Sequence, residues 1–115
     1  MKTNDVIRLQ HMLFYAKTTV QFISGKTRND LNNDIQLTLA IMKGIEIIGE
    51  AAANISQETK DQLSQFDWLD IIGMRNRLVH VYFNIDFDII WDTLKGDIPT
   101  LIKELEKIPE LKNFI

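Results

Sequence analysis

Residues 31–55, LNNDIQLTLAIMKGIEIIGEAAANI, carry a long and regular helical pattern. Apolar or small side chains recur every three or four residues, which is the spacing of one face of an α-helix. These positions are Leu37, Ile41, Gly44, Ile45, Ile48, Ala52 and Ile55. We therefore predict one helix from about Leu31 to about Ile55, with Asp30 as its N-cap. Small residues such as Gly44 and Gly49 would let another helix approach closely, within a bundle or across a dimer.

A second helical pattern precedes this stretch. Its apolar positions are Leu9, Leu13, Ala16, Val20 and Ile23. Asn4 or Asp5 can cap its start, and Gly25 provides its stop. After the central helix, the polar residues 56–65 read as a connector with room for a short helical turn.

The C-terminal part predicts two more helices. The third begins at Asp67 and runs to about Val81. The fourth is capped by Asn84 or Asp86 and carries apolar residues at helical spacing as far as Ile108. Residues 96 and 99 of that pattern are glycine and proline, which predicts a kink or a break into two helices. Four amphipathic helices with short connections indicate an all-α, antiparallel bundle.

Length and composition fit one domain over residues 1–115. The chain has five Gly and two Pro, which is few for the many tight turns of an all-β fold. It has no cysteine, which excludes disulfides, thiolate catalysis and cysteine-based zinc sites. There is no signal-peptide pattern and no apolar run long enough to span a bilayer, so we expect a cytoplasmic protein. With a formal net charge of −3, any contact with nucleic acid is expected to be local and transient.

The predicted third helix places a charge on an apolar face. At about 100° per residue, the apolar stripe contains Trp68, Ile71, Ile72, Leu78, Val79 and Tyr82. Arg75 falls in the middle of this stripe, where its guanidinium needs a carboxylate, a water-lined cleft or an anionic ligand. Leu69, Gly73, Asn76 and His80 form a neighbouring face, and Arg77 points away into solvent.

The cluster of Arg75, Asn76, His80 and Tyr82 suits phosphodiester chemistry. Arginine binds phosphate oxygens, and histidine exchanges protons near neutral pH. On an ideal helix, however, Arg75 and His80 lie about 140° apart. A cleft between two subunits, or unwinding near His80, would be needed to bring them to one substrate. Each residue also has a purely structural alternative. Arg75 pairs with Glu46 or Glu50, His80 is a surface or helix-terminal histidine, and Tyr82 is an aromatic residue at the edge of the core.

The same residues resemble a known family. Arg75, Asn76 to Val79, His80, Val81 and Tyr82 match the R-x4-H-x-Y signature of HepT-like HEPN proteins. GIEIIGEAAANIS (residues 44–56) resembles the second-helix segment of that family. WLDIIGMRNRLVHVYFNIDFDIIWDTLKGDIP (residues 68–99) resembles its motif helix and the segment that follows. The resemblance therefore covers the middle and later parts of the chain.

The resemblance implies a four- to five-helix HEPN bundle that forms a homodimer, with two motifs meeting in a shared cleft. It implies the toxin of a type VII toxin–antitoxin pair, a metal-independent RNA endonuclease that needs no cofactor. In this reading Arg75 holds the scissile phosphate and His80 assists proton transfer. Asn76 orients the phosphate or His80, and Glu46 or Glu50 orients Arg75. The implied antitoxin is an MntA-type nucleotidyltransferase that transfers AMP to Tyr82.

Two other classes of function stay open at this point. A non-catalytic HEPN module that serves a minimal nucleotidyltransferase as partner or substrate-binding subunit fits the acidic pI. A purely structural dimerisation bundle explains the stripes and the small residues, but it does not explain Arg75 on the apolar face. RNA cleavage by wild type and by a His80→Ala variant separates the ribonuclease from the non-catalytic module.

Overall fold

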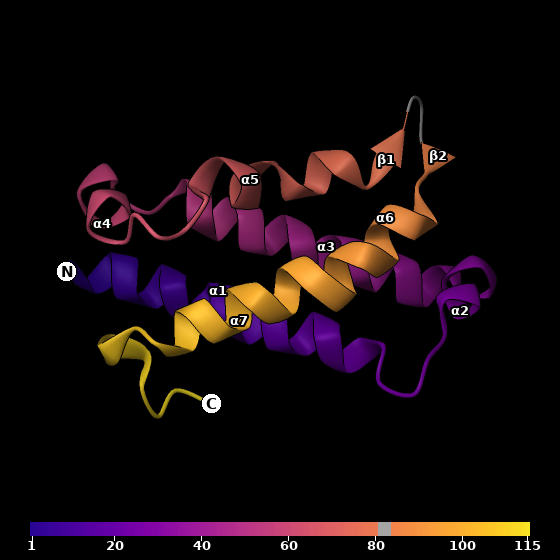
Figure 1. The fold of residues 1–115 in the computed structure, drawn as a ribbon, viewed down its shortest axis with the longest axis horizontal. Coiled ribbons are helices and arrows are strands. Elements are labelled where there is room, and N and C mark those ends of the chain that lie inside the picture. The colour runs from indigo at the N-terminus through magenta and orange to yellow at the C-terminus, as the bar shows by residue number, and fades with distance from the viewer. Residues whose placement is uncertain (81–83) are drawn as a thin grey trace.

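The computed structural model describes residues 1–80 and 84–115, apart from the side chain of His80, and this part of the chain is mostly helical. Figure 1 shows the long helices lying side by side as an elongated antiparallel bundle. The helices of the bundle are α1 (Thr3–Phe22), α3 (Ile35–Ala53), α5 (Trp68–Gly73) with the 3-10 turn η1 (Met74–Arg77), and α6 (Phe87–Asp92), which continues through the π-helical segment η2 (Thr93–Asp97) into α7 (Ile98–Glu106). The all-α bundle predicted from the sequence is confirmed.

Short elements join these helices. One small antiparallel pair of strands interrupts the helical pattern, with Val79 opposite Ile85 and His80 opposite Asn84. The connecting elements are α2 (Arg28–Asn33), α4 (Gln57–Gln62), β1 (Val79–His80), β2 (Asn84–Ile85) and η3 (Pro109–Leu111). The short helix α4 is the helical turn expected within the polar connector.

The core is formed by the inward stripes of α1, α3 and the α6–α7 helix. Its fully buried side chains include Leu9, Leu13, Ile41, Ile45, Ile48, Ile90, Leu94, Ile98 and Leu105. Two glycines of α3 bring neighbouring helices close, as their small size predicts. A Cβ at Gly44 would overlap the methyl group of Thr19 on α1, and one at Gly49 would lie 3.1 Å from the carbonyl oxygen of Ile72 on α5. Both close approaches are therefore contacts within the bundle.

The predicted single helix over residues 31–55 is wrong at its start, because the helix is interrupted at Asp34, between α2 and α3. The Asp34 carboxylate accepts a hydrogen bond of 3.0 Å from the backbone N–H of Leu37 and so caps α3. Asp30 is not an N-cap but the third residue of α2, where it forms a capping box with Thr27. Asn and Asp side chains compete for backbone hydrogen bonds in this way, and they favour new helix starts over helix interiors.

The structure of the segment after β2 agrees better with the prediction made from the sequence. Asp86 caps α6 by accepting a hydrogen bond of 3.0 Å from the N–H of Ile89. The irregularity predicted at Gly96 and Pro99 is present as η2, which contains Gly96 and ends just before Pro99, the second residue of α7. The helical stripe ends at Glu106, before Pro109.

The prediction that Asn4 or Asp5 caps α1 is also wrong, since Asp5 instead bonds to residues near α4. Lys2 occupies the N-cap position, and Asp5 is buried inside the first turn. Its carboxylate accepts hydrogen bonds from the hydroxyl of Ser56 (2.6 Å), the hydroxyl of Thr59 (2.7 Å) and the N–H of Ser56 (3.0 Å). Burial raises the pKa of Asp5, but these hydrogen bonds and the charge of Lys2 outweigh it and lower the pKa to about 2. Asp5 thus ties the start of α1 to the start of α4.

Replacing Asp5 tests this link. Asp5→Ala leaves one buried donor on Thr59 and two half-buried donors on Ser56 without their acceptor, which is expected to lower the unfolding free energy by roughly 1–3 kcal/mol at pH 7. Because the folded-state pKa is depressed to about 2 from an ordinary 3.8, this stabilisation is present above about pH 4 and is lost as the pH falls through 2. Chemical denaturation between pH 2 and 7 measures the difference. Asp61→Ala, on the exposed side of α4, is the control, and a pH-independent difference would contradict the assignment.

Candidate functional site

The motif predicted from the sequence lies where α5 ends. Met74 donates its N–H to the carbonyl of Ile71, so the helix tightens into the 3-10 turn η1. The N–H of Leu78 then bonds to the carbonyl of Arg75 (3.1 Å), and the N–H of Asp86 bonds to the carbonyl of Leu78 (2.8 Å). Arg75 and Asn76 therefore lie on η1, and the backbone of His80 lies on β1 (Figure 1).

The predicted helix to Val81 is consequently too long. Regular helix ends at Gly73, and the 3-10 turn ends at Arg77. The angle of about 140° between Arg75 and His80 holds only for a continuous α-helix and does not apply here. Of the two solutions expected from the sequence, the described backbone contains the unwinding before His80. A dimer therefore no longer follows from the helical angle alone.

Arg75 is an exposed residue at the border of the buried face, so the prediction that it lies in the middle of that face is wrong. The buried residues of this segment are Ile71, Met74 and Leu78. The predicted stripe had Arg75 at its centre and omitted Met74, and its member Trp68 is only half-buried. The side chain of Arg75 is 57% exposed. More than half of this side chain is thus open to solvent and to a ligand.

Of the two carboxylates expected to pair with Arg75, the structure pairs Glu46 with it. Nη1 of Arg75 lies 3.7 Å from Oε1 of Glu46, and Nζ of Lys43 lies 3.9 Å from the other oxygen of that carboxylate. Both distances are too long for strong hydrogen bonds. Glu50 is exposed on the next turn of α3. The Arg75–Glu46 contact is therefore loose, and it leaves the donors of the guanidinium available.

A partly apolar surface flanks the motif. Leu69, Gly73 and Asn76 follow one another at intervals of four and three residues on α5 and η1, which places them on one face. Leu69 is 85% exposed, and a Cβ at Gly73 would meet no atom within 4 Å. On α3, Leu39 is 54% exposed and precedes Glu46 by two turns. This surface is uncovered in the single chain.

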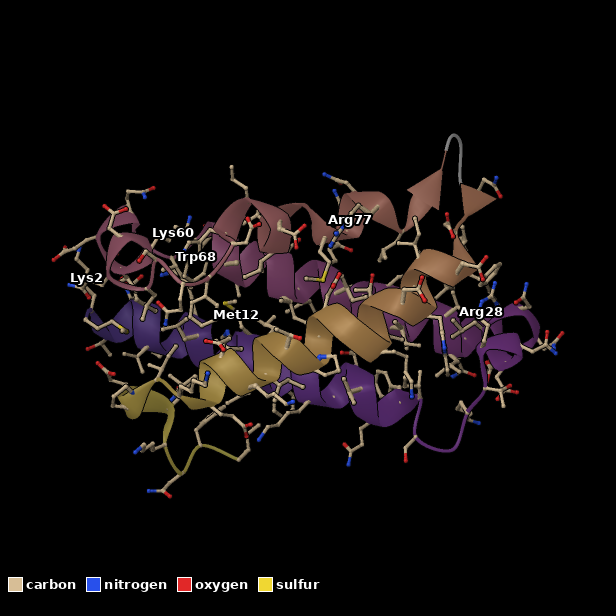
Figure 2. The ribbon with its side chains drawn as sticks, viewed as in Figure 1. Lys2, Met12, Arg28, Lys60, Trp68 and Arg77 are labelled. Atoms are coloured by element: carbon tan, nitrogen blue, oxygen red, sulfur yellow. The ribbon has the colours of Figure 1, made fainter. Side chains whose placement is uncertain are left out.

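Arg77 was expected to be solvated, and it is partly exposed, but it also has two partners that the sequence did not reveal. Its Nη1 lies 3.1 Å from Asp70 on α5, and its Nη2 lies 3.5 Å from Asp97 on η2. Figure 2 shows Arg77 reaching from η1 toward the helix that contains η2. Asp70 is two helical turns before Arg77, a spacing that could have suggested the first contact. Nothing local in the sequence signals the contact with Asp97.

Some predicted site features lie outside the described residues. These are Tyr82, within residues 81–83 that join β1 to β2, and the side chain of His80. Among the residues that the structure describes, no three His, Asp or Glu side chains are grouped so that they could hold a metal ion. In the same part of the chain, no helix is long and apolar enough to cross a membrane.

Comparisons with known proteins agree with the family expected from the motif. Residues 12–108 match the family described as "Ribonuclease HepT-like". The chain is 36% identical over 100 residues to "Putative RNase TTE0752" of Caldanaerobacter subterraneus, covering 87% of this chain and 89% of that protein. It is 32% identical over 98 residues to "Putative RNase MJ1380" of Methanocaldococcus jannaschii, with coverages of 85% and 90%.

A third relative carries the family's own name. "Probable ribonuclease HepT" of Thermococcus cleftensis is 37% identical over 75 residues, covering 65% of this chain and 68% of that protein. No solved structure matches the chain significantly. The helical bundle, the motif segment and the extent of the match define the class: the chain belongs to the HepT-like ribonuclease family.

Proposed function

We propose that this protein is a metal-independent RNA endonuclease whose active site is built around Arg75 and His80. The observation that carries the proposal is the exposed guanidinium of Arg75 on η1, directly before the strand that contains His80. Membership of the HepT-like ribonuclease family supports RNA as the substrate. Local positive charge from Arg75 and Lys43 gives phosphate a place to bind on a chain whose net charge is −3.

The proposed reaction uses the 2′-hydroxyl of the substrate as nucleophile. Its oxygen attacks the adjacent phosphorus while His80 accepts the hydroxyl proton, and the bond to the 5′-oxygen of the next nucleotide breaks. The products are a 2′,3′-cyclic phosphate and a 5′-hydroxyl, the latter taking up a proton. Arg75 binds the phosphate oxygens and stabilises the charge that develops on them. Asn76, exposed beside Arg75, orients the phosphate or His80. Glu46 orients Arg75 from α3, with Glu50 one turn further along.

We propose further that two copies form the complete site. The supporting observation is the uncovered apolar surface beside the motif, with Leu69 and Leu39 exposed and Gly73 open. Leu69 also lines an open groove of about 400 Å³ next to α4, together with Trp68 and Ile72. A second chain on this surface would bury these side chains and bring two copies of Arg75 toward one RNA.

The proposed biological role is that of a toxin held in check by modification. In this role a partner MntA-type nucleotidyltransferase transfers AMP from ATP to Tyr82, with a bond forming between the tyrosyl oxygen and the α-phosphorus while pyrophosphate leaves. Tyr82 follows His80 by two residues, so the added phosphate would lie near the motif in the chain. A bulky anion there would compete with RNA for the positive charge of Arg75.

The first prediction concerns RNA cleavage. His80→Ala and Arg75→Ala are each expected to lower the cleavage rate by at least roughly 100-fold, through loss of proton transfer and of phosphate binding respectively. A fluorogenic RNA and total cellular RNA serve as substrates, in the presence of a metal chelator. Arg8→Ala on α1 is the control for loss of a guanidinium, and circular dichroism checks folding. Undiminished cleavage by the His80→Ala variant would show that His80 is not part of the active site. A wild-type protein that does not cleave RNA but binds the nucleotidyltransferase would favour the non-catalytic module.

The second prediction concerns the dimer. Leu69→Glu places a charge on the uncovered apolar surface and is expected to shift the protein from dimer to monomer in analytical ultracentrifugation. Cleavage per chain should fall in parallel, by roughly tenfold or more at micromolar concentration. Ile7→Glu, at an exposed apolar position of α1, should change neither property. A monomeric Leu69→Glu variant with full activity would refute the composite site.

The third prediction concerns neutralisation. The chain has two tyrosines, which provides a matched pair of variants, Tyr82→Phe and Tyr15→Phe. Tyr82→Phe should stay toxic when the nucleotidyltransferase is co-expressed, and its mass should remain unchanged. Tyr15→Phe and wild type should both be silenced and should gain an adenylyl group. A silenced Tyr82→Phe variant with the same gain in mass would place the modification elsewhere.

A further inference from the structure

Arg77 holds the motif turn between two different elements. Its guanidinium contacts Asp70, on the helix before the turn, and Asp97, on a helix twenty residues later in the chain. Each carboxylate is met by a different terminal nitrogen, at 3.1 Å and 3.5 Å. We call these three residues the Arg77 clamp. The clamp links η1 to both α5 and η2, which otherwise belong to separate layers of the bundle.

Packing alone holds only one side of η1. Met74 and Leu78 are buried and fix the inner face of the turn. On the side of the Arg77 clamp, however, a cavity of about 260 Å³ lies between α5 and the α6–α7 helix. Ile71, Met74 and Leu101 contribute to its apolar lining, and Asp70 and Asp97 to its acidic rim. On the other side, a Cβ at Gly73 would contact nothing within 4 Å. The ion pairs of Arg77 therefore add a restraint on the exposed face of η1 to the packing of Met74 and Leu78 on its inner face.

Rotation of this turn would move the proposed catalytic groups. Arg75, Asn76 and Arg77 are consecutive residues of one four-residue 3-10 turn, so they move together. Asp97 comes from a π-helical segment, and such segments occur frequently at functional sites. We infer that Arg77 is a positioning residue for the reaction, in that the Arg77 clamp fixes the rotation of η1 at which Arg75 and Asn76 face RNA. This inference rests on the ribonuclease function proposed above.

The charges around Arg77 argue against a direct contact with RNA. The two carboxylates of the Arg77 clamp outnumber its one guanidinium, so phosphate would be repelled there. Arg75, in contrast, has one carboxylate at 3.7 Å, shared with Lys43. The two arginines of the motif segment therefore have different tasks: Arg75 is available to an anion, and Arg77 is occupied by the protein.

Steady-state kinetics of RNA cleavage test the inference. Arg77→Gln and Asp97→Asn are each expected to lower kcat roughly tenfold, because a small misplacement of reacting groups is costly, while KM changes less than about threefold. Since both variants break the same clamp, the double variant should be little slower than either one. Arg77→Lys keeps the charge and should restore most of the rate. The control is Arg28→Gln, which breaks a comparable ion pair between α2 and α6. In that pair, Nε of Arg28 lies 2.7 Å from Oδ1 of Asp88.

A second measurement does not depend on activity. Amide hydrogen exchange at Leu78, whose N–H bonds to the carbonyl of Arg75, should quicken in Arg77→Gln and Asp97→Asn but not in Arg28→Gln. Melting temperatures of the three variants should be similar, because exposed ion pairs add little to global stability. If wild type fails to cleave RNA, the proposed function fails, and exchange at Leu78 still decides whether the clamp holds η1.

Three outcomes would overturn the inference. Unchanged kcat together with unchanged exchange at Leu78 would show that the Arg77 clamp positions nothing. A loss confined to KM, with a weaker dependence on salt, would make Arg77 a contact to RNA phosphate. Equal losses of rate in Arg77→Gln and Arg28→Gln, in step with their melting temperatures, would reduce the clamp to a general stabilising contact.

Discussion

The close approach of α5 to α3 at Gly49 is the contact on which the position of the motif depends. The carbonyl oxygens of Ile71 and Ile72 lie 3.5 Å and 3.1 Å from the place where a Cβ of residue 49 would be. A larger residue would therefore push the end of α5 outward. Glu46 lies three residues before Gly49 on α3, and Arg75 lies on η1, directly after α5. The close approach of the two helices therefore places Arg75 opposite the carboxylate of Glu46.

From this contact the segment changes its backbone geometry within a few residues. The α-helix becomes a 3-10 turn and then a strand, while Met74 and Leu78 stay buried on the inner side. The exposed outer side carries Arg75 and Asn76, two of the residues expected to act on RNA. An acidic protein can offer an anion site in this way, because only the few charges near the motif, and not the net charge of the chain, decide whether a phosphate is attracted locally.

Hydrophobic periodicity predicted the helical bundle well, and it failed where polar side chains bond to the backbone or to distant partners. Asp34 starts a new helix inside an apparently continuous pattern, and Asp5 turns inward to Ser56 and Thr59 instead of capping α1. Arg75 was placed wrongly because the buried face of its segment contains Met74, together with Ile71 and Leu78, and leaves Arg75 exposed. The spacing of apolar residues reports neither a helix cap such as Asp34 nor the contact of Asp5 with Ser56, which lies 51 residues away in the chain.

The sequence by itself determined the fold class, the approximate course of the long helices and the family, because apolar spacing and the R-x4-H-x-Y signature are local patterns. It also supplied the identity of the proposed catalytic residues. Only the tertiary structure decided that the helix ends before His80, that Glu46 rather than Glu50 contacts Arg75, and that Asp97 reaches Arg77. These outcomes depend on how neighbouring helices are placed, and the physical reason is that burial and charge pairing act between segments far apart in the chain.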